Sequence, residues 1–371
     1  MSYQLTVPCL LGLEAPIADE LRRLGLDHVA AENGRVNFTG GAEAIAKANV
    51  NLRVGERVLL ELGRFQALSF DELFEGTRAL PWESIIPKDG AFPVKGYSLN
   101  SKLFSVSDCQ SIIKKAIVER LKAVYHVSWF QETGASYQVQ FSIMKDQVSL
   151  CIDTSGEGLH KRGYRPAHNA APLKETMAAA MVKFSRYRGR DDFCDPFCGS
   201  GTIPIEAALI AKNRAPGLNR RFRCMDWSII PARCWDDVRE AARAAEFHGD
   251  YRIIGSDIDP EAIEMARANA VRAGVDDVVR FEVADATVFN RVTERGVIVT
   301  NPPYGERIME KAEAERLYRE FGQAWRESRN WQLYLLSSHT EFERCFGKQA
   351  DKKRKLYNGM IKCDLFMFFK N

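Results

Sequence analysis

The tetrapeptide Asn301-Pro302-Pro303-Tyr304 follows an apolar run at 297–300 and combines residue types that could position a reactive nitrogen. Two consecutive prolines remove two backbone donors and fix φ twice, which gives a stiff loop. The Asn301 side-chain oxygen and the Pro302 carbonyl would be fixed acceptors for the two N–H groups of an amine conjugated to a ring or carbonyl. Such acceptors let a delocalised nitrogen become more tetrahedral and nucleophilic. The alternative is an ordinary strand exit, because Pro and Asn are common turn residues.

Tyr304 adds an aromatic ring to this loop. The ring could stack on a base that has left its helix, as happens in enzymes that modify bases. In that role the ring matters and the hydroxyl does not, so we expect a Tyr304→Phe change to be mild. Catalysis would come from positioning and electrostatics and would need no metal ion. The six histidines show no HExxH spacing.

A second segment, DPFCGSGT at 195–202, is typical of a strand that runs into a glycine turn and then a helix. Gly199 and Gly201 would let the backbone approach a ligand closely and would leave helix N-terminal N–H groups free. The segment is neither GxGxxG nor a Walker loop, because no Gly-Lys-Ser/Thr follows. A tight turn that binds nothing is the alternative.

Acidic residues stand at the ends of two further apolar strands. Asp257, in IIGSDIDP at 253–260, is nearest its strand end, where a carboxylate could accept hydrogen bonds from ribose hydroxyls. Asp259 precedes Pro260 and fits a helix N-cap with proline at N1. Asp285, in FEVADAT, could accept from an exocyclic amine, although a capping role would also explain it.

Strands and helices alternate around these loops from residue 173 onward. Apolar strands are expected at 191–197, 251–258, 278–285, 296–303 and 331–338, and a final strand pair at 353–363 and 364–370. This alternation predicts an α/β domain with a mostly parallel, doubly wound sheet and helices on both faces. Ligands of such sheets lie beyond the carboxyl ends of the strands, so the four loops should meet there.

Residues 1–155 show short strands and amphipathic helices that indicate small α+β sheets. The stretch QVQFSIMKDQVSLCIDTS is typical of a hairpin that turns at Lys145 and Asp146. Residues 156–172 contain three Gly and two Pro and are expected to form a connector. The cofactor loops all follow this connector, so we expect a chain starting near residue 160 to bind the cofactor alone.

The four loops together resemble those of class I S-adenosylmethionine-dependent methyltransferases. The combination of Asp-Pro-x-Cys-Gly-Ser-Gly-Thr with Asn-Pro-Pro-Tyr resembles enzymes that methylate nitrogens conjugated to a ring or carbonyl. The whole pattern is most similar to bacterial THUMP-domain RNA methyltransferases of the rRNA guanine-N2 type. Three further stretches support the resemblance: LHKRGYR at 159–165, APLKETMAAAMV at 171–182 and KRKLYNG at 353–359.

The resemblance implies a Rossmann-like methyltransferase domain at 173–371, a linker at 156–172, a THUMP RNA-binding module at 56–155 and a ferredoxin-like segment at 1–55. It implies S-adenosyl-L-methionine as cofactor and RNA as partner, with ribosomal RNA ahead of transfer RNA. The implied cofactor-binding residues are Asp195, Cys198, Gly199, Gly201, Thr202, Asp257 and Asp285, and the implied catalytic residues are Asn301, Pro302, Pro303 and Tyr304. We expect Cys198 to pack as a small residue and not to act as a nucleophile.

Basic residues with nearby tyrosines suggest an RNA-binding face. The candidates are Lys95 and Lys102 in the THUMP region and Lys161, Arg162 and Arg165 in the connector. Each of these side chains alone could equally be a solvated surface charge. The formal net charge of +3 neither demands nor excludes a nucleic-acid partner.

Composition places the chain among globular proteins, with 46% hydrophobic and 27% charged residues in 371. No apolar run is long enough for a membrane span, and the N-terminus lacks the pattern of a signal peptide. Nine cysteines without CxxC pairs argue against a zinc site and indicate reduced thiols in a cytoplasmic protein.

Five hypotheses for the function stay open at this point. The leading one is transfer of a methyl group to guanine N2 in large-subunit ribosomal RNA. Guanine N2 of transfer RNA and adenine N6 of RNA or DNA are alternatives within the same chemistry, as is a protein glutamine side chain. A THUMP-like module argues against DNA and protein substrates. The alternative of another class is a non-catalytic RNA-binding or ribosome-assembly protein on a methyltransferase fold.

Overall fold

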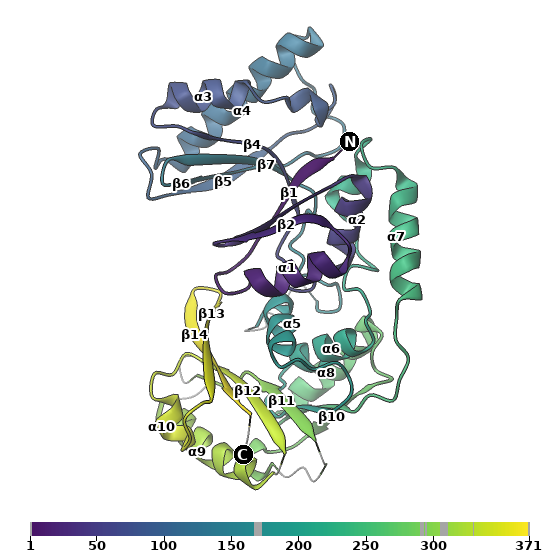
Figure 1. The fold of residues 1–371 in the computed structure, drawn as a ribbon, viewed down its shortest axis with the longest axis vertical. Helices are drawn as coiled ribbons and strands as arrows, with labels where there is room; N and C mark the ends of the chain where they lie inside the picture. Colours follow the sequence, from purple (N-terminus) through teal and green to yellow (C-terminus); the bar gives the residue numbers. More distant parts are fainter. Residues whose placement is uncertain are drawn as a thin grey trace.

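The computed structural model describes residues 2–166, 173–289, 293, 295–304, 311–328 and 330–369. Connector residues 167–172 therefore lie outside the described part of the chain. The molecule is elongated, with residues of the N-terminal half at one end and the C-terminal half at the other (Figure 1). Within the described residues, no helix is both long enough and apolar enough to cross a membrane.

The N-terminal half is built on one seven-stranded sheet in the order β2-β3-β1-β4-β7-β6-β5. Its strands are β1 (Tyr3–Pro8), β2 (Asp27–Glu32), β3 (Arg35–Gly40), β4 (Leu59–Gln66), β5 (Val94–Leu99), β6 (Val139–Met144) and β7 (Gln147–Asp153). All neighbours are antiparallel except β5 and β6. The expected ferredoxin-like segment and THUMP module thus share a continuous sheet, joined by the β1–β4 pair.

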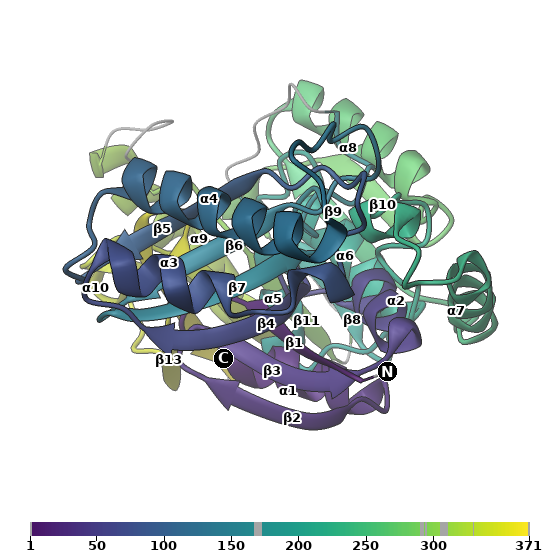
Figure 2. The same ribbon diagram turned by 90° about the horizontal axis from the view of Figure 1, so that it is seen from above.

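Helices cover both sides of this sheet. Their bounds are α1 (Glu14–Arg23), α2 (Ala42–Asn51), α3 (Phe70–Arg78) and α4 (Val106–Tyr125), with a 3₁₀ turn at Trp82–Ser84. Helices α3 and α4 pack on the outer face, whereas α1 and α2 face the C-terminal half (Figures 1 and 2). The predicted β6–β7 hairpin is confirmed: Lys145 and Asp146 both have positive φ, as a type I′ turn requires.

The C-terminal half contains a second seven-stranded sheet in the order β10-β9-β8-β11-β12-β14-β13. Its strands are β8 (Asp192–Asp195), β9 (Ile253–Asp257), β10 (Val279–Val283), β11 (Gly296–Thr300), β12 (Trp331–Ser337), β13 (Lys352–Asn358) and β14 (Ile361–Phe368). The first five are parallel, and the last two form an antiparallel hairpin at the edge. The predicted doubly wound α/β class is confirmed.

Helices flank this sheet on both faces: α5 (Glu175–Phe184), α6 (Thr202–Ala211), α8 (Pro260–Ala273), α9 (Lys311–Glu327) and α10 (Phe342–Phe346). Helix α7 (Ala232–Ala244) packs instead beside α2 (Figure 1), and short 3₁₀ turns lie at Arg223–Asp226 and Ala286–Val288. Strand alternation separates two cores. Val297 and Val299 of β11 face the core under α5, α6 and α8, and Ile298 faces the core under α9 and α10.

The first of these cores runs without a break into the N-terminal half, from Leu5 to Met367. Helix α5 is buried from Glu175 to Val182 and lies between α1 and the C-terminal sheet (Figure 1). Lys183 at its end pairs with Glu20 of α1 at 3.0 Å. A chain starting near residue 160 would expose this shared core, so we no longer expect such a fragment to be stable.

Candidate active site

The carboxyl ends of β8, β9 and β11 form the topological switch point of the C-terminal sheet. The chain leaves β8 for β9 and β10 on one side and returns to β11 on the other. In open α/β sheets, ligands bind in the crevice at this point. Asp195 ends β8, Asp257 ends β9, and Asn301 follows the last residue of β11. The structure therefore brings these three residues, predicted from sequence, to a single edge.

The glycine loop depends on backbone conformations that side chains disfavour. Gly199 and Gly201 have φ of 50° and 83°, in the left-handed region. A Cβ on Gly201 would come within 2.8 Å of the Phe281 ring, so helix α6 can pack here only with glycine at its N-cap. At Gly199 a Cβ would meet nothing within 4 Å, which leaves open space beside this loop for a ligand.

Asp257 connects the glycine loop to β9. Its Oδ2 accepts the Gly199 N–H at 2.9 Å, and its Oδ1 accepts the Asp259 N–H at 3.1 Å. A carboxylate offers about four lone-pair sites, so two remain for further donors such as ribose hydroxyls. Asp259 caps helix α8 by accepting from the Glu261 N–H at 2.9 Å, with Pro260 at N1. The prediction that Asp259 is the N-cap of a helix with proline at N1 is confirmed.

Asp195 is buried and tied to the tetrapeptide loop. Its Oδ1 accepts the Phe197 N–H at 3.1 Å and the Thr300 hydroxyl at 2.6 Å. Burial raises the pKa of Asp195 from 3.8 to about 7, against the lowering effect of these two hydrogen bonds, and the nearby charge of Asp257 adds to the rise. The carboxyl group is therefore poised to change charge near neutral pH, or to ionise when a cation binds beside it.

The Asn301–Tyr304 loop is braced from two sides. The Tyr304 hydroxyl donates to the Asn301 side-chain oxygen, and the Tyr318 hydroxyl on α9 donates to the Pro303 carbonyl at 2.7 Å. Pro302 is buried, and Tyr304 is half-buried beside Cys363. Burial raises the pKa of Tyr304, so its hydroxyl stays protonated and remains a donor. The Asn301 oxygen, predicted to accept from a base amine, is thus occupied by an internal donor in this conformation.

The remaining predicted cofactor residues occupy different surroundings. Cys198 is buried, and burial raises the pKa of its thiol, as do the charges of Asp195 and Asp257, which opposes thiolate formation. Thr202 is the buried first residue of α6. Asp285 is exposed and accepts from the Thr287 N–H and hydroxyl, each at 2.8 Å. The structure shows the capping role of Asp285, and its contact with adenine stays a prediction.

Two connector arginines predicted to bind RNA are placed otherwise by the structure. Arg162 is buried, with its guanidinium against Glu206 at 3.3 Å. Arg165 pairs with Glu175 at 2.8 Å and contacts the Thr202 hydroxyl at 3.3 Å. Both guanidinium groups are paired with carboxylates inside the protein, and removing either partner of such a pair would leave an uncompensated charge. We therefore withdraw Arg162 and Arg165 as RNA contacts, and Arg165 becomes a support for the N-terminus of α6.

The other three predicted RNA-binding lysines remain accessible. Lys95 on β5, Lys102 after β5 and Lys161 in the connector are exposed. The Lys102 N–H donates to Asp146 at 2.7 Å, which fixes its backbone beside the β6–β7 turn. Phe104 nearby is 81% exposed, an aromatic surface on which an unpaired base could stack.

Three residues that support the site were not predicted from the sequence. Thr300 holds Asp195, Tyr318 holds Pro303, and Asn269 of α8 donates its side-chain N–H to the Ser200 carbonyl of the glycine loop at 2.8 Å. Asn269 is buried, and its sequence signal is weak: it is a polar residue at a position on α8 that faces the core. Thr300 directly precedes the tetrapeptide, but threonine is common in strands, so its type alone did not indicate a role in the site.

The fold and this edge of the sheet define a class I methyltransferase: a glycine loop into a helix, followed by acidic ends on adjacent parallel strands. Three family models match the chain: "RlmL ferredoxin-like domain" at residues 4–59, "THUMP domain" at 67–153 and "RMKL-like, methyltransferase domain" at 162–366. The chain belongs to the RMKL-like methyltransferase family. This membership confirms the predicted cofactor, S-adenosyl-L-methionine.

Two curated proteins show this similarity over nearly the whole chain. "Putative RNA methyltransferase YpsC" of Bacillus subtilis (strain 168) is 46% identical over 370 residues, covering 99% of this chain and 96% of that protein. "Ribosomal RNA large subunit methyltransferase K/L" of Psychromonas ingrahamii is 35% identical over 368 residues, covering 97% of this chain. The chain spans only 49% of the length of the latter protein.

Solved structures share the fold in full. A crystal structure from Listeria monocytogenes, described as a "predicted N6-adenine-specific DNA methylase", has a TM-score of 0.95 and 48% identity, covering 100% of this chain and 97% of that one. The protein SMU.472, solved in complex with SAH, has a TM-score of 0.94 and 41% identity, with coverage of 100% and 98%. The names of these relatives therefore disagree on the nucleic acid that is methylated.

Proposed function

We propose that this protein transfers a methyl group from S-adenosylmethionine to an exocyclic amino nitrogen of an RNA base, with guanine N2 of large-subunit ribosomal RNA as the leading target. The observation that carries the proposal is the buried hydrogen bond between Thr300 and Asp195. It fixes the Asn301 loop against the strand end that precedes the glycine loop. An amine held by Asn301 would thus lie beside the cofactor loop.

The cofactor, when bound, supplies an electrophilic methyl group on sulfur. The residues that would hold it are Asp195, the backbone of Gly199 to Gly201, and Asp257. The open space beside Gly199 and the free lone pairs of Asp257 fit such a ligand. Asp195, whose pKa lies near 7, can ionise opposite a ligand ammonium group. We propose Asp285 as an acceptor for the adenine amine.

The chain's own contribution to the reaction is to orient the target nitrogen. Asn301 Oδ1 and the Pro302 carbonyl would each accept one N–H, which turns the nitrogen lone pair toward the methyl group. To bind there, the amine has to replace the Tyr304 hydroxyl on Asn301. The new N–C bond forms as the S–C bond breaks, and the amine loses one proton to solvent.

The N-terminal half favours RNA over DNA as the substrate. THUMP is the RNA-binding module expected from the sequence, and its model matches residues 67–153. Exposed Lys95, Lys102 and Phe104 give this region positive charge and a stacking surface. The proposed domains remain a ferredoxin-like segment at 1–55, a THUMP module at 56–155, a linker at 156–172 and a methyltransferase domain at 173–371. With RNA as the substrate, the proposed location is the cytoplasm.

Methyl transfer to RNA from a strain that lacks the gene tests this proposal. The purified protein and labelled S-adenosylmethionine should modify that RNA and leave RNA from the parent strain unmodified. Nucleoside mass spectrometry should then find N2-methylguanine in the large-subunit ribosomal RNA fraction. N6-methyladenine, or label only in transfer RNA, would replace the proposed target with one of the alternatives. No transfer by a protein that binds the cofactor would favour the non-catalytic class.

A further inference from the structure

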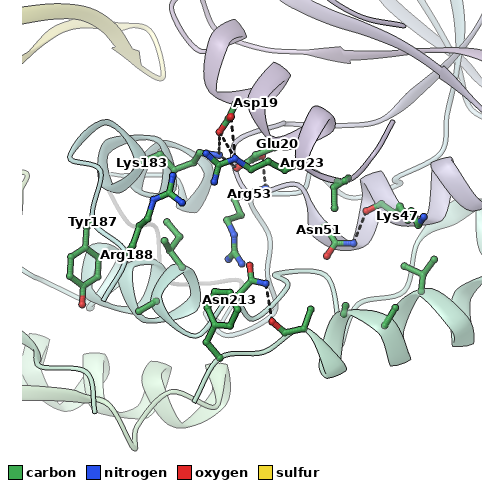
Figure 3. A pocket seen from close by; sticks show the side chains of 18 of the residues that line it. Asp19, Glu20, Arg23, Lys47, Asn51, Arg53, Lys183, Tyr187, Arg188 and Asn213 are labelled. Carbon is green, nitrogen blue, oxygen red and sulfur yellow. Dashed lines mark hydrogen bonds and ion pairs between the residues drawn. The ribbon is translucent and has the colours of Figure 1, made fainter. Parts of the chain in front are cut away.

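A cavity of about 580 Å³ lies between the N-terminal helices and the C-terminal half (Figure 3). Its walls come from α1, α2, the residues between α5 and β8, the end of α6, and α7. Residues 186–188 lead to the amino end of β8, and Asn213 follows the carboxyl end of α6. The cavity therefore opens at the opposite edge of the sheet from Asp195 and Asn301, and it is not the methyl-transfer site.

The charge of this cavity is strongly positive. Its lining contains six basic side chains and two acidic ones: Arg23, Lys47, Arg53, Lys183, Arg186 and Arg188 against Asp19 and Glu20. Both acids are already engaged within the protein, since Asp19 pairs with Arg23 at 3.1 Å and Glu20 pairs with Lys183 at 3.0 Å. Lys47 is paired as well, with Glu43 at 2.6 Å. Among the described residues, the guanidinium groups of Arg53, Arg186 and Arg188 are therefore the positive charges left for a ligand.

Arg53 gives the strongest evidence that the ligand of this cavity is an anion. Its backbone is fixed, because its N–H donates to Glu20 at 3.0 Å and its carbonyl accepts from Arg162. Its side chain extends into the hollow, and Arg188 reaches toward the same space from the other side (Figure 3). Nη1 of Arg53 is buried and, among the described residues, has no hydrogen-bond partner. A buried donor left unpaired is costly, and an anion would satisfy it.

A third arginine, Arg186, also lines the cavity. This residue has φ of 59°, in the left-handed region that glycine favours, directly after the end of α5. An arginine that tolerates this conformation places a third guanidinium on the cavity wall. Guanidinium groups bind phosphate through paired N–H donors. Three of them on one wall therefore favour a ligand that carries a phosphate over an uncharged ligand.

The wall opposite these arginines is apolar. It is formed by Val238, Ala241 and Ala242 of α7, with Phe247 beyond the helix. Phe247 is 59% exposed, so much of its ring is accessible to a ligand. The volume falls within the range of about 300–1,000 Å³ that small-ligand sites occupy. A ligand that fits both walls carries a phosphate at one end and a planar ring at the other.

We propose that this cavity binds a nucleoside phosphate, with the phosphate on Arg53 and Arg188 and the base against Phe247. The ligand is either a free nucleotide or one nucleotide of a bound RNA strand, and the chemistry of recognition is the same. The proposal does not depend on methyl transfer, because the two sites lie at opposite edges of the sheet.

Calorimetric titration of the full chain with adenosine monophosphate, and separately with a short single-stranded RNA, tests this site. The double variant Arg53→Gln/Arg188→Gln should bind the responding probe at least about tenfold more weakly than wild type. Arg233→Gln is the matched control, because the side chain of this α7 arginine is 87% exposed and its ion pair, among the residues described, is with Asp237 four positions further along, at 3.4 Å. Titration with S-adenosylmethionine shows whether each variant is folded, and its affinity should not change.

The two probes separate the sources of the ligand. Mononucleotide binding that the double variant weakens assigns a free nucleotide to the cavity. Binding of the RNA oligomer alone, weakened by the same substitutions and not by Arg233→Gln, assigns a nucleotide of an RNA strand. Unchanged affinity of the double variant for the responding probe overturns the proposal. So does the absence of binding of either probe to wild type at about 1 mM.

Discussion

Thr300 at the end of β11 donates its hydroxyl to Asp195 at the end of β8 across 2.6 Å, and both residues are buried. The two belong to loops more than one hundred positions apart in the chain. One loop carries the glycines that would hold the cofactor, and the other carries Asn301. This single bond therefore sets how the proposed amine acceptor lies relative to the proposed methyl donor.

Replacing Thr300 with Val should loosen this relationship while keeping the side chain's shape. We expect a loss of about 1–3 kcal/mol in the free energy of unfolding, because Asp195 loses a buried donor. Methyl transfer should fall further than stability alone explains, since the Asn301 loop is no longer held in register. Urea unfolding and single-turnover transfer at saturating cofactor measure the two effects.

Thr39→Val is the control for that substitution, because it removes an exposed hydroxyl that contacts His28 at 2.8 Å on the N-terminal sheet. It should leave stability and transfer almost unchanged. A Thr300→Val protein that is less stable but transfers at the wild-type rate would show that the bond serves only the fold.

The pKa of Asp195 makes stability depend on pH in a defined direction. Burial raises this pKa from 3.8 to about 7, so the native state binds a proton that the unfolded state releases. Stability from this group is complete below pH 3.8 and is lost as the pH rises to about 7. The difference in unfolding free energy between wild type and Asp195→Asn should fall across that window. A difference that rises with pH would place the charge of Asp195 in a favourable environment instead.

Removing the Asn301 side chain should separate catalysis from folding. Asn301→Ala should retain the fold and cofactor affinity while turnover falls roughly 10²–10³-fold, as expected for one fixed acceptor at the reacting centre. Methyl transfer to unmodified RNA, a melting curve and a cofactor titration measure the three properties. Near-normal transfer would leave Asn301 with only a role in the turn.

Tyr304→Phe gives a companion test of the same loop. It removes the hydroxyl that occupies Asn301 Oδ1 and keeps the ring. The acceptor then has no internal competitor, so transfer should stay within about threefold of wild type, at a cost of about 1 kcal/mol in stability. A loss as large as that of Asn301→Ala would mean that the hydroxyl itself takes part in binding the amine.

Asp257 and Asp259 should differ in what they support. Asp257→Ala should weaken S-adenosylmethionine binding by on the order of 2–4 kcal/mol, because it loses ribose acceptors and the Gly199 contact together. Asp259→Ala removes an N-cap and should cost about 0.5–2 kcal/mol of stability without changing cofactor affinity. Cofactor titration beside thermal melting distinguishes them. Equal affinities for both variants would refute the ribose assignment.

The sequence predicted the strand-end residues well because their positions depend on local signals. Apolar strands, glycine turns and the Asp-Pro pair at 259–260 all act within a few residues, and a parallel sheet then brings the ends together. The elements that were missed lack such signals. Strand β2 is almost entirely exposed and pairs only with β3 at the sheet edge, so no apolar alternation marks it.

Partners of charged side chains could not be predicted in the same way. Arg162 looks like part of a basic connector, but the fold places it against Glu206, 44 positions away. Which cations become buried depends on how α6 packs under the N-terminal half, and no local pattern carries that information. Loss of Arg162 would leave the buried Glu206 carboxylate without its paired cation, although the Tyr164 hydroxyl still donates to it at 3.1 Å, and such a loss costs several kcal/mol. The boundary between the last two strands was also expected too late in the chain, because the hairpin turns at Gly359 and β14 begins at Ile361 instead of residue 364.

The core shared by both halves has a consequence for how a substrate could be chosen. Asn49 of α2 bonds to Thr154 after β7 at 2.9 Å, and the Gly217 N–H reaches the Val50 carbonyl at 2.9 Å, so all three regions of the chain are joined through α2. An RNA held at Lys102 and Phe104 would meet Asn301 only if its own shape spans a fixed gap. Under the proposed function, such a protein would select RNA by the distance between two features of its folded form. A nucleotide with the right neighbours at the wrong distance would be left unmodified.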